Sequence, residues 1–342
     1  MAADLSAEAQ AMPAGIPIVD LAGLYGDDPA ARQAVAARIG AACDEIGFFY
    51  AVGHNVPLAT IERAVAMADR FFHLPEAERL KVKADSNNRG YRDVWDSLHR
   101  NGKNNARDSF DLGFPVTADD PEVRAGTPLY APNNWPDLPG FREAIETYYG
   151  ETYKLGMKIL EGFALYLGKP ANFFTRRFTK PVADMVINHY LGNAGLHISD
   201  QASGPHTDHG IVTILWQDEL GGLEVMGKDG KWISVTPLRG SYIINIGELM
   251  KRWTNGRFKA TVHRVVHLRD MPRYSMPLFC NPDFRTIVDP RELGVSDADA
   301  QFEPVVSGDF LLSRFKATRK LWGATKAATV STDANLVEAP VK

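Results

Sequence analysis

The sequence is poor in cysteine. Its 342 residues include only two, Cys43 and Cys280. Two thiols are too few for a disulfide framework, and they lack the close spacing of metal-binding cysteines. With 45% hydrophobic and 23% charged residues, the chain has the composition of a globular protein with a substantial core. We therefore expect a protein of a reducing compartment, the cytoplasm.

The sequence also lacks a large excess of charge and any long apolar run. The formal net charge is −4, and no basic cluster indicates a nucleic-acid partner. No apolar stretch approaches the roughly 20 residues that a membrane-spanning helix needs. Residues 1–15 have neither a basic start nor an apolar centre, which predicts a disordered tail rather than a signal peptide. A small molecule is the expected partner, and the oligomeric state cannot be predicted.

Hydrophobic periodicity divides the chain into a largely helical part and a strand-rich part. Apolar residues recur at helical spacing in three segments, residues 29–46, 58–73 and 139–167. Short β-rich runs accompany them at residues 16–20, 48–52 and 108–114. From residue 185 to about residue 280 the pattern alternates with a period of two, between turn sequences such as Gly221-Gly222 and Asn255-Gly256. This pattern predicts a mainly β fold with flanking helices, built as a double-sheet barrel.

A His-x-Asp pair provides the first candidate metal ligands. His206 and Asp208 precede the β-rich run 211–216. We expect both to lie on one extended strand, where they share a face and their Cα atoms are ~6.6 Å apart. A metal ion needs a further donor, and His263 in a second β-rich run supplies it. Two histidines and one carboxylate form the facial triad that is typical of non-haem Fe(II) oxygenases.

Other interpretations of these residues exist. Alone, a His-x-Asp pair is more often a hydrogen-bonded surface pair than a metal site. Zinc hydrolases use similar ligands, but the helical His-Glu-x-x-His pattern is absent here. Among rival ligands, His209 would point away from the strand face of His206, and His267 would lie too far from His263.

A candidate anion clamp follows the third ligand. Arg273 and Ser275 share one face if their segment is a strand, and a guanidinium binds a carboxylate with two parallel hydrogen bonds. Upstream, Asn188 and Tyr190 share the face of another predicted strand. A metal triad and an anion clamp together indicate a site for a carboxylate-bearing ligand beside the metal.

The ordered motifs resemble the isopenicillin N synthase-like branch of the 2-oxoglutarate/Fe(II) oxygenases. They extend from about Ile16 to about Arg319 and comprise Ile16-Pro17-Ile18-Val19-Asp20-Leu21, Gly47-Phe48-Phe49-Tyr50-Ala51-Val52-Gly53-His54, Asn188-x-Tyr190, His206-Thr207-Asp208-x-Gly210, Gly221-Gly222-Leu223, Asn245-Ile246-Gly247, Thr254-Asn255-Gly256-Arg257, His263-Arg264-Val265 and Arg273-x-Ser275. Two positions depart from the common pattern. Glu248 stands where relatives usually carry aspartate, and no Tyr-Pro pair follows Asn188.

The resemblance implies a jelly roll, or double-stranded β-helix, within one oxygenase domain. We expect this domain to span residues 16–322, with an N-terminal helical and strand region (16–184), a jelly-roll core that carries the iron (185–290) and a C-terminal helical segment (291–322). Residues 1–15 and 323–342 are expected to be disordered tails.

The resemblance also implies the reaction and its cofactors. Fe(II) would be bound by His206, Asp208 and His263. The co-substrate 2-oxoglutarate would be held by a clamp of Arg273, Ser275, Tyr190 and Asn188. With O2, the enzyme would oxidise a C–H bond of a small molecule by hydroxylation, desaturation or cyclisation and release succinate and CO2.

Two alternatives and the substrate pocket stay open at this point. An isopenicillin N synthase-like oxidase uses O2 without 2-oxoglutarate, and a barrel could also bind a ligand without catalysis. The family's substrate contacts correspond to Arg89, Tyr91, Leu215 and Leu223. However, a solvated loop arginine and two core leucines explain Arg89, Leu215 and Leu223 equally well. The sequence does not identify the substrate.

Overall fold

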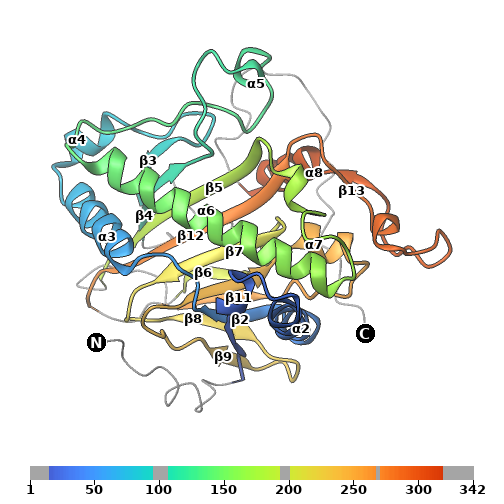
Figure 1. The fold of residues 1–342 in the computed structure, drawn as a ribbon. Helices are drawn as coiled ribbons and strands as arrows, with labels where there is room; N and C mark the ends of the chain where they lie inside the picture. Colours follow the sequence, from blue (N-terminus) through green and yellow to red (C-terminus); the bar gives the residue numbers. More distant parts are fainter. Residues whose placement is uncertain (1–14, 95–106, 193–200, 267–269, 319–342) are drawn as a thin grey trace.

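The computed structural model of the chain describes residues 15–94, 107–192, 201–266 and 270–318. Its centre consists of a large and a small β-sheet that face each other, with helices on the outer side of the large sheet (Figure 1). The two predicted tails, apart from Gly15, lie outside the described residues, and so does the chain after residue 318. The predicted division into regions stays a prediction.

The strands fall into three sheets. The large sheet contains β1 (Ile18–Asp20), β2 (Phe48–Val52), β10 (Tyr242–Ile246), β7 (Val212–Gln217), β12 (Arg273–Asp283), β5 (Pro181–Tyr190), β4 (Arg107–Leu112) and β3 (Gly90–Arg92), in this spatial order. The small sheet contains β6 (Gln201–His206), β11 (His263–Val266), β8 (Leu223–Met226) and β9 (Trp232–Ser234). A two-stranded sheet pairs β13 (Ile287–Val288) with β14 (Val305–Val306).

The helices are α2 (Pro29–Glu45), α3 (Leu58–Phe72), α4 (Glu76–Leu80), α5 (Pro121–Arg124), α6 (Phe141–Tyr166), α7 (Glu248–Trp253) and α8 (Ser307–Thr318), with 3-10 turns η1 (Ala22–Leu24), η2 (Thr175–Arg177) and η3 (Pro290–Leu293). The start of α2 follows from its sequence, because Asp28 accepts a hydrogen bond from the Ala30 N–H at 2.9 Å and Pro29 needs none. Figure 1 shows α6 running across the large sheet. None of the described helices is long and apolar enough to cross a membrane.

Side-chain alternation along the large sheet separates two hydrophobic cores. One face packs against α2, α3 and α6, and this core includes Ile39, Phe71 and Ile159. The opposite face looks toward the small sheet, where a second core gathers Phe48, Tyr50, Tyr190, Leu223, Val225, Ile243 and Val265. The large sheet thus contributes to a core on each face, and its inner face encloses the space between the sheets.

Most expected elements are confirmed. The three long helices agree with the periodicity of the sequence to within a few residues, as do the strands that begin near residues 16, 48 and 108. The jelly-roll expectation is confirmed by the two facing sheets, in which all pairings between the described strands are antiparallel except that of β1 with β2.

The expectation that His206 and Asp208 share one strand is wrong. β6 ends at His206, and Asp208 lies in the connection to β7. β6 pairs with β11 in the small sheet, whereas β7 pairs with β10 and β12 in the large sheet, so the chain changes sheets at this point. Gly210 permits the close crossing, because a Cβ atom there would lie 2.0 Å from Oδ1 of Asn281.

Candidate metal centre and co-substrate site

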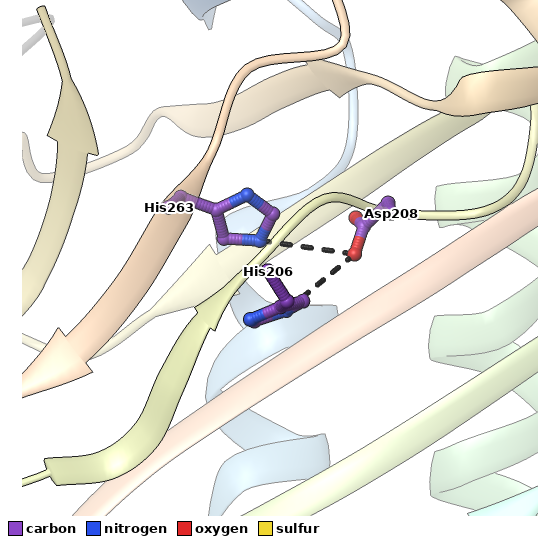
Figure 2. Close-up of side chains that lie close together, drawn as sticks. All are labelled: His206, Asp208 and His263. Atoms are coloured by element: carbon purple, nitrogen blue, oxygen red, sulfur yellow. Dashed lines mark ion pairs between the residues drawn. The ribbon is translucent and has the colours of Figure 1, made fainter. Parts of the chain in front are cut away.

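His206, Asp208 and His263 converge where the two sheets meet (Figure 2). One ligand atom from each lies within 4.8 Å of the others. Oδ1 of Asp208 is 3.8 Å from Nε2 of His206 and 3.7 Å from Nε2 of His263, and the two imidazole rings are 4.3 Å apart between centroids. His206 and His263 are directly opposite each other on the paired strands β6 and β11. The structure therefore brings the three predicted ligands together, although Asp208 reaches the cluster from a loop.

Backbone carbonyls fix the tautomer of both histidines. Nδ1 of His206 lies 2.8 Å from the carbonyl oxygen of Gly204, and Nδ1 of His263 lies 3.2 Å from that of Thr261. Because a carbonyl oxygen only accepts, each Nδ1 carries the proton and each Nε2 presents a lone pair. Two lone pairs and a carboxylate oxygen then point at one another, which is unfavourable unless a cation lies between them.

Two hydrogen bonds orient the Asp208 carboxylate. Nδ2 of Asn245 donates to Oδ2 at 2.7 Å, and the Thr213 hydroxyl donates to the same oxygen. The other oxygen, Oδ1, faces Nε2 of His206 and of His263. Although burial favours the neutral acid, the nearby His263 and His206 and these two donors lower the pKa of Asp208. The aspartate is therefore ionised at neutral pH and can serve as a ligand.

His206 is also in the protonation state that metal binding requires. Although 42% of its side chain is exposed, the protein around the ring nitrogens desolvates the imidazolium. This desolvation and the neighbouring His263 lower the pKa of His206 to about 4, against the opposing effect of Asp208. The ring is therefore neutral at physiological pH.

Arg273 is a buried cation on the inner face of the large sheet. The residue is 1% exposed. Nε donates to the carbonyl oxygen of Gly221 at 2.5 Å and Nη2 to Oε1 of Gln217 at 3.0 Å. Among the described residues, Nη1 has no hydrogen-bond partner and no carboxylate forms an ion pair with this guanidinium. A buried charge with an unused donor fits a negatively charged ligand such as the distal carboxylate of 2-oxoglutarate.

The other predicted clamp residues surround Arg273. Tyr190 is directly opposite Arg273 in the β12–β5 pair, and the guanidinium lies 4.7 Å from the centre of its ring. Ser275 is opposite Asn188, whose Nδ2 donates to the serine hydroxyl at 3.2 Å. Burial opposes ionisation of Tyr190, but Arg107 and Arg273 outweigh it and lower the pKa of this tyrosine. The structure therefore gathers all four predicted clamp residues on one face.

Arg89 and Tyr91 have mainly protein partners. The Arg89 guanidinium is buried, lies 3.1 Å from Oδ1 of Asp184 and donates to the carbonyl oxygen of Leu129. The hydroxyl of Tyr91 donates to Oδ2 of Asp108 at 3.1 Å. Arg89 is therefore not a solvated loop arginine, and its contacts are those of a structural ion pair. The substrate contacts of both residues stay predictions.

Leu215 and Leu223 belong to the core between the sheets. Leu223 is buried there, and Leu215 packs against the same cluster. Both positions suit either a pocket wall or simple packing. His209 is not part of the three-residue cluster, and His267 lies outside the described residues.

Several residues around the site were not assigned from the sequence. Thr213 and Asn245 orient Asp208, Gln217 holds Arg273, and Phe48 packs edge-on against His263 at 5.4 Å between ring centres. Asn245 lies in one of the motifs and could have been found there. Thr213 contacts a residue only five positions before it, but nothing in the apolar run indicates this role. The roles of Gln217 and Phe48 depend on which strands are neighbours, which a single sequence does not reveal.

Comparisons with known proteins agree with this geometry. Residues 16–138 match the family model of the non-haem dioxygenase N-terminal region in morphine synthesis, and residues 182–282 match that of the 2OG-Fe(II) oxygenase superfamily. A 2-oxoglutarate-Fe(II) type oxidoreductase of Emericella nidulans, hxnY, is 34% identical over 79% of this chain and 81% of its own length. A homoarginine-6-hydroxylase of Oryza sativa subsp. japonica is 31% identical over 87% and 96%, respectively.

The structural comparison gives the same assignment. A full-length Neurospora crassa protein, solved in complex with alpha-KG and thymine, superposes with a TM-score of 0.78 at 26% identity and covers 89% of this chain and 97% of its own. An oxidase that works without 2-oxoglutarate is not favoured by relatives of this kind. The chain belongs to the 2-oxoglutarate/Fe(II) oxygenase superfamily, in its isopenicillin N synthase-like branch, and is an oxidoreductase that uses Fe(II), 2-oxoglutarate and O2.

Proposed function

We propose that this dioxygenase binds Fe(II) through His206, Asp208 and His263, and that it oxidises a small organic molecule. The observation that carries the proposal is the set of three ligand atoms that lie within 4.8 Å of one another with their lone pairs converging. A surface hydrogen-bonded pair would not need this arrangement. Bound iron would couple the decarboxylation of 2-oxoglutarate to succinate and CO2 with the oxidation of a substrate C–H bond.

We assign the distal carboxylate of 2-oxoglutarate to Arg273. Its unused Nη1 is available to that carboxylate, and the Ser275 hydroxyl can add one more hydrogen bond. Asn188 holds the Ser275 side chain, and the ring of Tyr190 lies against the guanidinium. The clamp would therefore hold the distal carboxylate of 2-oxoglutarate. The 2-oxo acid end of this molecule would then be oriented toward the iron before O2 reacts.

The primary substrate is proposed to be a small molecule that enters between the two sheets. Relatives named for homoarginine hydroxylation, and a structural neighbour solved with thymine, support this size class. Leu215 and Leu223 would offer an apolar surface to the substrate. We place the enzyme in the cytoplasm, because its two cysteines are buried and unpaired and because Fe(II) persists best under reducing conditions.

Removal of single ligands tests the metal assignment. His206→Ala and Asp208→Ala should each abolish Fe(II) binding and the conversion of 2-oxoglutarate to succinate, because two remaining donors hold the metal poorly. Iron content by elemental analysis and succinate by mass spectrometry are the readouts. Circular dichroism should show that both variants remain folded.

His73→Ala provides the matched control for the loss of a histidine. His73 lies at the exposed C-terminal end of α3, outside the three-residue cluster. This variant should bind iron and form succinate as the wild type does. Wild-type succinate formation by the Asp208→Ala variant would contradict the metal assignment.

A further inference from the structure

Three neighbouring strands place two arginines on either side of one tyrosine. In the register of β4, β5 and β12, Arg107 is opposite Tyr190, and Tyr190 is opposite Arg273. Residues directly opposite each other in an antiparallel sheet point to the same face. Because Tyr190 belongs to the core between the sheets, all three side chains project from the inner face, toward the small sheet.

Arg107 has no anionic partner among the described residues. Its Nη1 donates to the Tyr190 hydroxyl at a long 3.4 Å, and its guanidinium carbon lies 5.8 Å from the centre of that ring. Nε is buried, and within the described ranges it has no hydrogen-bond partner and no carboxylate forms an ion pair with Arg107. The arginines nearby differ in this respect, since Arg79 pairs with Asp108, Arg89 with Asp184 and Arg92 with Asp111.

Tyr190 separates Arg107 from Arg273 along the sheet. Two strand spacings separate the Cα atoms of these arginines by about 10 Å, and the Tyr190 ring is in contact with both guanidiniums. Arg107 therefore lies on the inner face of the large sheet, beside the clamp and on the far side of Tyr190 from Arg273.

Within the part of the chain that the structure describes, the charges of the proposed complex leave Arg107 without a counter-ion. The charges of Fe(II) and of Arg273 are balanced by the Asp208 carboxylate and the two carboxylates of 2-oxoglutarate. Arg92, which lies on the neighbouring edge strand, is neutralised by Asp111 at 2.7 Å. A partly buried guanidinium without a counter-ion is unfavourable, so a further anion beside Tyr190 would stabilise the site.

We propose that Arg107 binds the carboxylate of the primary substrate, so that the enzyme acts on a small carboxylic acid. This inference rests on the proposed function, because it takes Arg273 and the metal as the binding sites of 2-oxoglutarate. Ser109, two residues along the same strand and on the same face, is neutral and donates to Asp111. Selection for negative charge therefore falls to Arg107.

A panel of matched acids and amides tests this inference. Aliphatic, aromatic and amino acids, homoarginine among them, would each be compared with their primary amides. Binding would be measured by thermal shift and calorimetry on the anaerobic protein loaded with Fe(II) and saturating 2-oxoglutarate. We expect some acids to bind roughly tenfold to hundredfold more tightly than their amides, because a charge-assisted pair is lost in the amide. Arg107→Gln should remove this preference, and Arg107→Lys should retain part of it.

Controls separate this inference from the proposed function. The charge-transfer absorption of 2-oxoglutarate bound to Fe(II) should persist in Arg107→Gln and in the presence of the acids, which shows that they have not displaced the co-substrate. Arg63→Gln, which alters an exposed arginine on α3, should bind acids as the wild type does. If no acid binds, if amides bind equally well, or if Arg107→Gln leaves acid binding unchanged, the inference is overturned. If the wild-type absorption itself is absent, the proposed function fails.

Discussion

At the scale of single residues, the candidate metal centre depends on the groups behind its ligands. Backbone carbonyls hold both imidazoles in the tautomer whose Nε2 has a free lone pair. Replacing a side chain cannot remove these carbonyl groups. The Asp208 carboxylate, in contrast, is held by the side chains of Asn245 and Thr213. Such outer groups orient the ligands of a metal and influence its affinity.

Replacing Asn245 tests this support. Asn245→Leu should weaken Fe(II) or Co(II) binding roughly 10–100-fold, because Oδ2 of Asp208 loses a buried donor and the carboxylate can turn away from the histidines. Metal titration under anaerobic conditions measures the effect. Asn188→Leu is the matched control, since Asn188 donates to Ser275 rather than to the metal ligand, and its metal affinity should equal that of the wild type. Equal metal affinity in the Asn245 variant would mean that the hydrogen bond does not orient Asp208.

The sequence predicts the candidate metal ligands and the clamp arginine, but only some of the residues that surround them. His206, Asp208, His263 and Arg273 carry distinctive chemistry at recognisable spacings. The hydroxyl of Thr213 orients Asp208, but this residue lies within an apolar run and does not stand out in the sequence. Arg107 begins a strand in a region rich in loop residues. The contact of Thr213 with Asp208 spans only five residues, whereas the place of Arg107 depends on strand neighbours far away in the sequence, so that the register had to be known first.

At the scale of elements, the helical layer depends on a close approach of α2 to α6. A Cβ atom at Gly40 of α2 would lie 2.0 Å from Cδ1 of Tyr166 on α6. A Cβ atom at Gly150, in the middle of α6, would meet no described atom within 4 Å beyond its own helix and chain neighbours. Close packing therefore requires glycine at position 40, whereas position 150 has room for a side chain.

Alanine at these glycines should shift stability in opposite directions. Gly40→Ala should destabilise the protein by about 1–3 kcal/mol, because the added methyl group separates α2 from α6. Gly150→Ala should stabilise it by about 0.5–1 kcal/mol, because alanine loses less backbone entropy in a helix. Urea unfolding measures both values. A Gly40→Ala variant as stable as the wild type would show that the Tyr166 ring moves aside without loss of packing.

The helices and the change of sheet differ in how far the sequence predicts them. The periodicity of α2, α3 and α6 is local. The N-cap at Asp28 limits α2, and Gly168, which has a positive φ of 70°, follows the end of α6. The change of sheet between β6 and β7 is not local. It follows from pairing with β11 on one side and with β10 and β12 on the other, and the continuous β-like pattern after His206 does not indicate it.

At the scale of the whole molecule, the two sheets contribute different parts of one site. The small sheet carries both histidines, while the large sheet carries the groups that hold Asp208 and the whole clamp around Arg273. Iron and 2-oxoglutarate together would therefore connect the facing sheets. The helices on the outer side of the large sheet support the sheet that carries the clamp (Figure 1).

The central claim is that iron at the His206, Asp208 and His263 cluster and the Arg273 clamp bind the same molecule of 2-oxoglutarate. The most direct test is the visible metal-to-ligand charge-transfer absorption of the anaerobic protein with Fe(II), titrated with 2-oxoglutarate, in the wild type and in Arg273→Ala. The absorption should appear in the wild type. The Arg273→Ala variant should bind 2-oxoglutarate more weakly, by about 1.5–3 kcal/mol in binding free energy, because it lacks the charge-assisted hydrogen bond. No absorption despite bound iron, or equal 2-oxoglutarate affinity in the variant, would contradict the account.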